Sequence, residues 1–224
     1  MRKPSLQDYR LYFVTDPILH KGYSVLEQVE LALRGGVKII QIREKNLPLP
    51  EYSKLASEAM KLTRTHNAFL IINDAVDVVK EVAADGLHLG QEDMPITKAR
   101  AILGNDVIIG ISVKTVGEAQ QAERDGADYL AVNGVFPTQT KEDLGYCPGL
   151  EGVGMIRNNT VLPIVGIGGI NLNNCRSVLQ AGANGIAVVT SITMSEDIPG
   201  TCRSFFKLMS TVDSEKRNVI AIED

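Results

Sequence analysis

Residues 69–93 read FLIINDAVDVVKEVAADGLHLGQED, in which two short apolar runs, 69–73 and 86–89, are each followed by an aspartate. If these runs are neighbouring parallel strands, Asp74 and Asp93 meet at one edge of the sheet. Two carboxylates about 6 Å apart at an effective dielectric of about 20 repel each other by roughly 3 kcal/mol. A hard cation between them would offset this repulsion, and oxygen ligands favour Mg²⁺. We therefore expect a Mg²⁺ site and, with it, a phosphate-bearing substrate.

Apolar runs of the same kind recur along the whole chain. They are rich in Val, Ile and Leu and do not alternate with polar residues, which is typical of parallel strands that are buried on both faces. We expect eight strands, at 11–15, 39–43, 69–73, 86–89, 108–112, 129–132, 163–167 and 185–189.

Helical patterns separate these strands, as at Val25, Val29 and Leu33. Residues that cap or start helices stand at the expected N-terminal ends, and glycines that favour left-handed turns stand at the C-terminal ends. These residues are Ser24, Pro50, Pro95 and Asn173, and then Gly35, Gly36, Gly104, Gly126 and Gly182. Eight alternating units predict the α/β class and a single (β/α)8 TIM barrel.

The domain boundaries follow from where the helical pattern is lost. We assign residues 1–210 to the barrel as one catalytic domain, and we expect 211–224, a charged segment, to be a flexible and frayed C-terminal tail. The alternative fold is an open doubly wound sheet. Its dinucleotide-binding form is disfavoured because residues 15–20, TDPILH, stand where a glycine-rich turn would follow the first strand. The long segment 133–150 is expected to be a lid.

Composition limits the classes of partner. The formal charge is −4 and no block of Lys and Arg occurs, which argues against nucleic acid. No run approaches 18 apolar residues and no secretory leader pattern is present, so we expect no membrane association. Cys147, Cys175 and Cys202 are widely spaced and read as reduced thiols in a cytoplasmic protein. An exposed face of an outer helix could pair subunits of a homo-oligomer, although the sequence does not identify it.

Polar residues follow most of the predicted strands, and in a barrel such residues point into one active site. Gln41, Arg43 and Lys45 alternate, so their side chains project to one side, and two cations with an amide suit a diphosphate. The alternative is a solvated charged turn. Asp74 and Asp93 have their own alternative, because an aspartate between a strand and a helix is a common N-cap.

Ser112 and His88, on two of the predicted strands, can each be explained by a structural role instead of a role in ligand binding. Ser112 ends the fifth strand, where its hydroxyl can donate to a phosphate or a ring nitrogen, or simply cap or face solvent. His88 lies between Leu87 and Leu89 and is expected to be a structural imidazole with satisfied hydrogen bonds.

A second phosphate site is expected after strands seven and eight, where barrels bind anions with backbone N–H groups. Gly168, Gly169, Val189, Thr190 and Ser191 stand there, and a tight turn is the alternative for the two glycines. Thr138, Thr140 and Lys141 on the long loop supply two hydroxyls and a cation that would grip a phosphate when the loop closes, or else form an ordinary loop.

Seven segments, in the same order along the chain, resemble the successive motifs of the thiamine phosphate synthase (thiamine-phosphate pyrophosphorylase) family. They are LYFVTD (11–16), GGVKIIQIREK (35–45), IND (72–74), GLHLGQEDM (86–94), GIS (110–112), FPTQTK (136–141) and IGGI (167–170). The resemblance implies a magnesium-dependent transferase with the (β/α)8 fold. It joins hydroxymethylpyrimidine diphosphate to a thiazole phosphate, or to its carboxylated form with loss of CO₂, and releases diphosphate by a dissociative substitution.

The resemblance also implies roles for individual residues. Asp74 and Asp93 would hold Mg²⁺. The pyrimidine diphosphate would be bound by Gln41, Arg43, Lys45, Asn73, Ser112 and Lys141, of which Lys141, Arg43 and Ser112 are the expected catalytic residues. The thiazole phosphate would be bound by Thr138, Thr140, Gly169, Val189 and Thr190.

Some positions depart from the family pattern. Ala75 stands where arginine is frequent, Asn133 and Gly134 stand where Gly-Pro is usual, and Lys114 replaces a frequent histidine. We expect these residues to lie beside the ligand groups rather than on them. Two related functions remain as alternatives. One is a thiazole tautomerase, which needs no metal pair, and the other is a non-catalytic sensor of thiamine phosphate.

Overall fold

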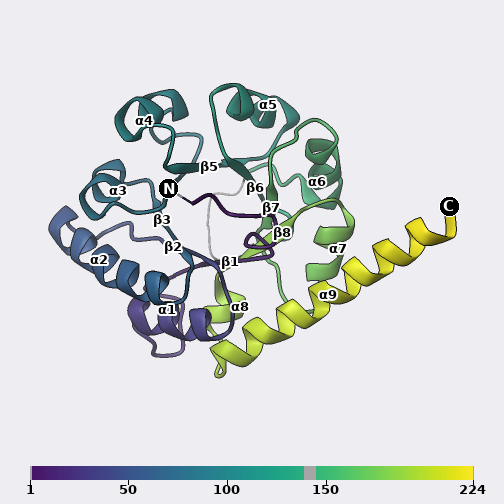
Figure 1. The fold of residues 1–224 in the computed structure, drawn as a ribbon, viewed down its shortest axis with the longest axis horizontal. Helices are drawn as coiled ribbons and strands as arrows, with labels where there is room; N and C mark the ends of the chain where they lie inside the picture. The colour runs from purple at the N-terminus through teal and green to yellow at the C-terminus, as the bar shows by residue number, and fades with distance from the viewer. Residues whose placement is uncertain (1, 139–144, 224) are drawn as a thin grey trace.

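The computed structural model describes residues 2–138 and 145–223, and it contains a closed barrel of parallel strands (Figure 1). Each strand pairs with the next along the chain, and the last pairs with the first. The strands are β1 (Leu11–Val14), β2 (Ile39–Ile42), β3 (Phe69–Asn73), β4 (Gly86–Leu89), β5 (Ile108–Val113), β6 (Tyr129–Asn133), β7 (Ile164–Ile167) and β8 (Gly185–Val188). The expected fold is confirmed, and every predicted strand is correct to within one residue at each end.

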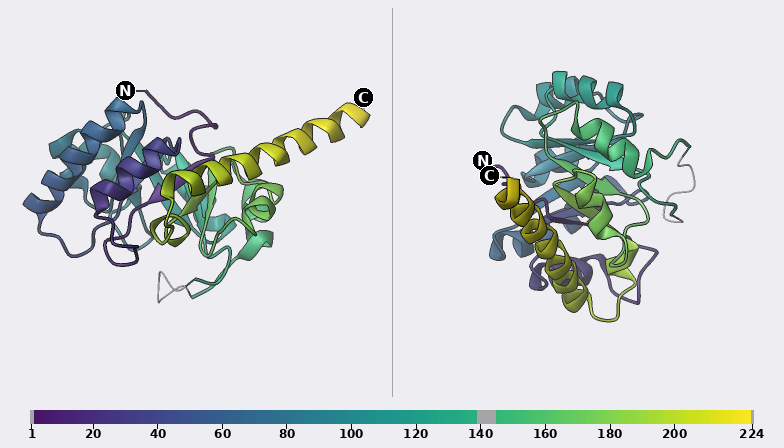
Figure 2. Two further views of the ribbon diagram at one scale, coloured as in Figure 1. Left: turned by 90° about the horizontal axis from the view of Figure 1, so that it is seen from below. Right: turned by 90° about the vertical axis from the view of Figure 1, so that its right-hand side faces the viewer.

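Helices lie around the outside of the barrel (Figures 1 and 2). They are α1 (Val25–Arg34), α2 (Leu49–Thr65), α3 (Val76–Val82), α4 (Ile96–Leu103), α5 (Val116–Arg124), α6 (Gly149–Arg157), α7 (Cys175–Gln180), α8 (Thr190–Thr193) and α9 (Ile198–Glu223). One apolar core fills the space between strands and helices, and a second, smaller core fills the barrel itself. The inner core includes three tyrosines, Tyr9, Tyr12 and Tyr129. Strand residues therefore have two buried faces, which explains their continuous apolar runs.

The helix ends agree with the cap residues in the sequence. Ser24 and Glu27 form a reciprocal capping box at α1, in which the Glu27 N–H donates to Ser24 Oγ at 3.3 Å and the Ser24 N–H donates to the Glu27 carboxylate at 2.8 Å. Gly36 follows α1 with a φ of +97°, where glycine is favoured. The expected cap at Asn173 is wrong by one residue, because Asn174 directly precedes α7.

The C-terminal segment differs from its prediction. Helix α9 does not lose its structure at Ser210 but continues to Glu223, and its last turns extend beyond the barrel (Figure 2). Phe205, Met209 and Val212 are all buried and keep a helical spacing through residue 210. Arg176 also donates to Thr211 Oγ1 at 3.1 Å. These contacts hold the helix on the barrel as far as Val212, two residues beyond the predicted boundary at Ser210. The flexibility of 211–224 stays a prediction.

Two further expectations concern the cysteines and the membrane. All three cysteines have free thiols, and Cys175 and Cys202 are buried. Among the helices in the described part of the chain, none combines the length and apolar character needed to cross a bilayer.

Candidate active site

A pocket opens at the C-terminal ends of the strands, and the predicted site residues converge on it. Twelve of them line its wall, namely Gln41, Arg43, Lys45, Asn73, Asp74, Asp93, Ser112, Thr138, Gly168, Gly169, Val189 and Thr190. Thr140 and Lys141 lie outside the described residues. The barrel thus brings together residues of β2, β3 and β5 and residues of the segments that follow β2, β3, β4, β6, β7 and β8. Their roles toward substrates stay predictions.

The cationic side of the pocket is built by the end of β2. Gln41 is buried, Arg43 is half-buried and Lys45 is exposed, and all three face the pocket as the alternation predicts. The Arg43 N–H donates to Thr15 Oγ1 at 3.3 Å, which ties this turn to β1. Lys45 Nζ donates to Asp74 Oδ2 at 2.7 Å. A purely solvated charged turn is therefore not what this segment forms.

The two aspartates meet as expected. Neither caps a helix, because Ala75 precedes α3 and Pro95 precedes α4, and neither helix has a side-chain cap. Asp74 has a φ of +60°, a conformation that is uncommon for residues other than glycine. Asp93 Oδ2 accepts a hydrogen bond from the Gly90 N–H at 2.6 Å. Both carboxylates are therefore held in place by features that serve the pocket and not the helices.

The electrostatics of the pair show the expected conflict. Burial raises the pKa of Asp74 above its ordinary value, and the hydrogen bond with Asp93 raises it further, against the effect of Lys45. Burial also acts to raise the pKa of Asp93, but hydrogen bonds from Asp74 and the Gly90 N–H outweigh it and lower that pKa. Burial and the neighbouring carboxyl group therefore oppose ionisation of Asp74, whereas its hydrogen bonds favour ionisation of Asp93.

The donor set can be compared with the needs of a metal. Among the side chains that the structure describes, those of residues 2–138 and 145–212, no cluster of three or more His, Cys, Asp or Glu could hold a metal ion. Two carboxylates alone fit Mg²⁺ in the mode in which most of its ligands are water and substrate phosphate oxygens. They do not fit a closed site made by protein groups alone.

The opposite side of the pocket is made of backbone. Gly168 and Gly169 follow β7 with φ values of +113° and +58°. A Cβ at Gly169 would lie 2.3 Å from the carbonyl oxygen of Pro137 and would collide with it. The Phe136 N–H donates to the Gly168 carbonyl at 3.1 Å, so the start of the long segment after β6 packs directly on these glycines. Thr138 lines the pocket next to them.

The sequence patterns did not identify every residue that lines the pocket. His88 is hydrogen-bonded at both ring nitrogens, as a structural imidazole should be, but it also lines the pocket, as does Tyr12. The period of two along each strand points Tyr12 and His88 into the barrel, and this signal could have identified them. Asn133 also lines the pocket, and the expectation that it lies beside the ligand groups rather than on them stays a prediction.

Comparisons with known proteins agree with this site. Residues 11–192 match the family described as thiamine monophosphate synthase. The thiamine-phosphate synthase of Methanospirillum hungatei JF-1 is 46% identical over 202 residues, which are 90% of this chain and 98% of the relative. That of Clostridium novyi (strain NT) is 44% identical over 197 residues, which are 88% and 97% of the two chains.

A solved structure gives the same result. Thiamine phosphate pyrophosphorylase from Pyrococcus furiosus superposes with a TM-score of 0.84 at 40% sequence identity, over 92% of this chain and 98% of that one. This chain belongs to the thiamine monophosphate synthase family.

Proposed function

We propose that this chain catalyses thiamine phosphate synthesis. It joins hydroxymethylpyrimidine diphosphate to a thiazole phosphate and releases diphosphate, together with CO₂ when the thiazole is carboxylated. The observation that carries the proposal is the single pocket in which a carboxylate pair and two cations face a glycine-rich backbone. These are the groups needed to bind two phosphorylated substrates side by side.

The chemistry is a substitution at the exocyclic methylene carbon of the pyrimidine. The bond from this carbon to the diphosphate oxygen breaks, and its electron pair leaves with diphosphate. The thiazole nitrogen then donates its lone pair to the carbon. An electron-rich aminopyrimidine stabilises the intervening cation, so the substitution is dissociative. Little proton transfer is needed, and the enzyme acts mainly by positioning and by stabilising charge on the leaving group.

The leaving diphosphate is assigned to the side of the pocket formed by β2 to β4. Arg43 and Lys45 bind its oxygens, with Lys141 added from the long loop. When bound, Mg²⁺ would neutralise charge on the diphosphate, and Asp74 and Asp93 are the residues that would hold it. Lys45 already contacts Asp74, so cation and carboxylate are in place together. Asn73, on β3, and Ser112, on β5, line the same pocket.

The thiazole phosphate is assigned to the side formed by β7 and β8. Positive φ values at Gly168 and Gly169 allow the backbone to approach a ligand closely. Val189 and Thr190, at the start of α8, and Thr138 complete this side. The two phosphate sites then lie on opposite walls of one pocket, with the reacting carbon and nitrogen between them.

One assay separates this function from its two alternatives. Purified protein is given both substrates, with and without Mg²⁺, and thiamine phosphate and diphosphate are measured. We expect both products, and only with Mg²⁺. Isomerisation of the thiazole alone, without metal, would indicate a tautomerase. Binding of thiamine phosphate with no product would indicate a sensor.

A further inference from the structure

A continuous hydrogen-bond chain crosses the inside of the barrel and ends at Ser112. Gln41 Nε2 donates to the Tyr12 hydroxyl at 2.7 Å, and the hydroxyls of Tyr12 and Tyr129 are 2.8 Å apart. The Tyr129 hydroxyl lies 2.8 Å from His88 Nδ1, and His88 Nε2 lies 3.0 Å from Ser112 Oγ. Five side chains from five strands are therefore linked end to end, and both end residues line the pocket.

The backbone is shaped to let Tyr129 reach His88. His88, Gly110 and Tyr129 are register partners across β4, β5 and β6. A Cβ at position 110 would lie only 2.0 Å from the Tyr129 ring. Glycine there leaves room for the ring to pass over β5, and the ring stacks on His88 with 5.6 Å between centroids. The link between β6 and β4 thus depends on a missing side chain on β5.

The chain has a direction because it begins at the NH₂ group of Gln41, which can donate but cannot accept. This group donates a hydrogen bond to the Tyr12 oxygen, and the Tyr12 O–H in turn donates to the Tyr129 oxygen. The Tyr129 O–H then donates to His88 Nδ1. Burial raises the pKa of both tyrosines, so each keeps its proton. With these donor directions, His88 accepts at Nδ1 and carries its own proton on Nε2.

The direction decides what Ser112 offers to a ligand. His88 Nε2–H donates to Ser112 Oγ, so the serine oxygen is already an acceptor inside the protein. The remaining O–H of Ser112 is then available to the pocket as a donor. In the reversed chain Ser112 would donate to His88, and only a lone pair would face the ligand.

We propose that Tyr12, Tyr129 and His88 are positioning residues that act through Ser112, fixing its hydroxyl as a hydrogen-bond donor to an acceptor atom of the substrate. This inference rests on the proposed function, in which Ser112 contacts the pyrimidine diphosphate. The three residues touch no reacting atom. By fixing the Ser112 hydroxyl as a donor, they favour a substrate that places a hydrogen-bond acceptor, such as a ring nitrogen or a phosphate oxygen, beside Ser112.

The tautomer of His88 can be read directly in the ligand-free protein. The chain has three histidines, so long-range ¹H–¹⁵N correlations of the imidazoles are resolvable, and His88→Gln identifies the signal of His88. We expect the Nε2–H tautomer at neutral pH. An Nδ1–H tautomer or an imidazolium overturns the proposal. This measurement does not depend on turnover, so it stays informative even if wild-type protein forms no thiamine phosphate, which would be the failure of the proposed function.

Kinetics test whether the residues act through Ser112. Tyr129→Phe removes the hydroxyl that joins Tyr12 to His88, and we expect kcat/KM for the pyrimidine diphosphate to fall on the order of 10-fold. In a Ser112→Ala background the same change should have no further effect. An equal loss in both backgrounds overturns the proposal. Tyr9→Phe is the matched control, because Tyr9 is equally buried, lies 5.3 Å from the Tyr129 ring and is not part of the chain.

A second pair of variants keeps the test valid if Tyr129→Phe does not fold. The amide of a glutamine can replace the Nε2–H of His88, whereas the shorter asparagine can replace only the Nδ1 side. His88→Gln should therefore retain most of the activity, and His88→Asn should lose about as much kcat/KM as Ser112→Ala, on the order of 10-fold. Unfolding temperatures confirm that each variant is folded. Equal activity of the two His88 variants contradicts the proposal.

Discussion

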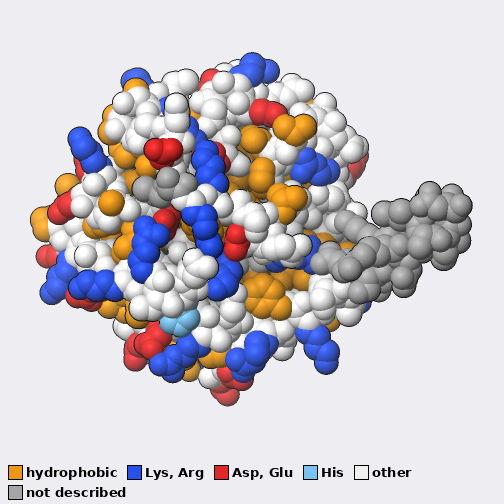
Figure 3. Space-filling model, viewed as in Figure 1, with side chains coloured by type: hydrophobic (Ala, Val, Ile, Leu, Met, Phe, Trp, Pro, Cys, Tyr) orange, Lys and Arg blue, Asp and Glu red, His pale blue; other side chains and the backbone are white. Residues whose placement is uncertain are grey.

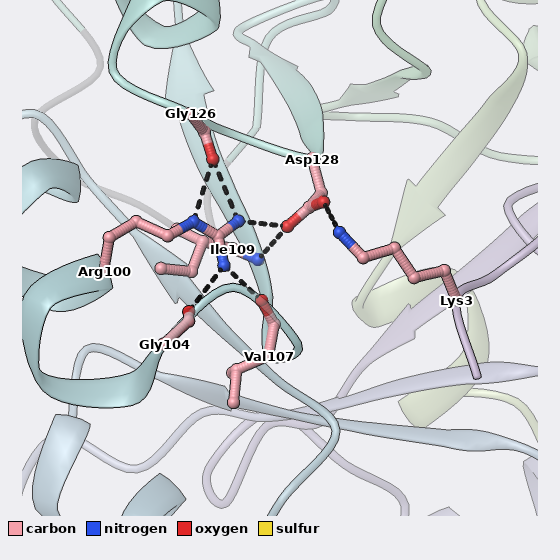
Figure 4. Close-up of polar contacts among 7 residues, drawn as sticks. All are labelled: Lys3, Arg100, Gly104, Val107, Ile109, Gly126 and Asp128. Atoms are coloured by element: carbon pink, nitrogen blue, oxygen red, sulfur yellow. Dashed lines mark hydrogen bonds and ion pairs between the residues drawn. The ribbon is translucent and has the colours of Figure 1, made fainter. Parts of the chain in front are cut away.

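Charged side chains are arranged differently at the two ends of the barrel. At the N-terminal ends of the strands, the carboxylate of Asp128 accepts from Arg100, from the Ile109 N–H at 2.8 Å and from Lys3 at 2.5 Å (Figure 4). At the C-terminal ends, Asp74 pairs with Lys45 and faces a second carboxylate, that of Asp93. At the N-terminal end the charges pair with one another within the protein. At the C-terminal end two carboxylates that repel each other lie beside a pocket.

The N-terminal end is organised around Arg100. All three guanidinium nitrogens donate, to the carbonyls of Gly104, Val107 and Gly126 and to Asp128 (Figure 4). On the face that carries the N-terminal segment, Lys and Arg side chains lie near the middle with Asp and Glu between them (Figure 3). Charges that are paired in this way hold loops to strands. They have little capacity left for a ligand.

The C-terminal end has the opposite character. Asp74 adopts a positive φ, which costs of order 1 kcal/mol for such a residue, and its pKa is raised by burial and by Asp93. Both features disfavour the ionised, folded form, and the surrounding barrel maintains them. Strain of this kind at the C-terminal ends of barrel strands is expected where a ligand completes the site. The comparison teaches that this end is built for binding and the other for stability.

The largest expected effect is loss of activity without loss of stability at Asp74. Asp74→Asn keeps the shape and tolerates the positive φ but removes a metal-binding charge, so we expect turnover to fall about 10³-fold. Steady-state kinetics at saturating substrate and Mg²⁺ measure this, with thermal unfolding as the control. Turnover near that of wild type would contradict the assignment of Asp74 to the metal.

The next effect concerns the long loop. Lys141→Ala should lower turnover about 10²-fold, because it removes a cation that stabilises the leaving diphosphate. Single-turnover measurements at saturating substrate separate this effect from weaker binding. Unchanged turnover would remove Lys141 from the catalytic groups.

At the N-terminal end the expected effect is on stability instead. Asp128→Ala leaves the Ile109 N–H without its acceptor and Arg100 without its carboxylate, so the free energy of unfolding should fall by about 2 kcal/mol. Urea unfolding measures the loss. Activity per folded molecule should not change, and a specific loss of turnover would break the distinction between the two ends.

A smaller effect is the pH dependence at Asp74. The pKa of Asp74 is higher in the folded protein than in the unfolded chain, so protonation of Asp74 stabilises the folded state. This stabilisation is fully present below the pKa of Asp74 in the unfolded chain, and it is lost as pH rises through its pKa in the folded protein. Without Mg²⁺, Asp74→Asn should gain stability relative to wild type as pH rises through this range and level off above it. Urea unfolding at a series of pH values tests this. A constant difference would show that the carboxylates do not repel.

The smallest effect is expected at the exposed edge of the N-terminal cluster. Lys3 contacts Asp128, but its side chain is 52% exposed. Lys3→Ala should change the free energy of unfolding by less than about 1 kcal/mol, since exposed ion pairs contribute little. Urea unfolding of Lys3→Ala and Asp128→Ala in parallel measures both losses. A loss for Lys3→Ala as large as that for Asp128→Ala would show that the contacts of Asp128 with Arg100 and Ile109 do not provide most of the stabilisation.

Much of the fold and part of the site were predictable because the patterns that indicate them lie within short stretches of sequence. Apolar runs predicted the strands. Asp74, Asp93, Arg43 and Lys45 were predicted because they follow the C-terminal ends of strands, which a parallel barrel brings together. The end of α9 was mispredicted because residues 213–218, DSEKRN, lack apolar side chains at helical spacing, although the helix continues through them. The chain from Gln41 to Ser112 was not predictable. It depends on contacts between residues as far apart as Tyr12 and Tyr129 and on the empty space at Gly110.

The most direct test of the account is calorimetric titration of Mg²⁺ into the protein, alone and with inorganic diphosphate present. The carboxylate pair supplies only part of a coordination shell, so Mg²⁺ should bind weakly alone and much more tightly with diphosphate. Asp74→Asn should abolish this enhancement, and Asp128→Asn, at the other end of the barrel, should not. Tight binding of Mg²⁺ without diphosphate, or an equal enhancement in Asp74→Asn, would contradict the account.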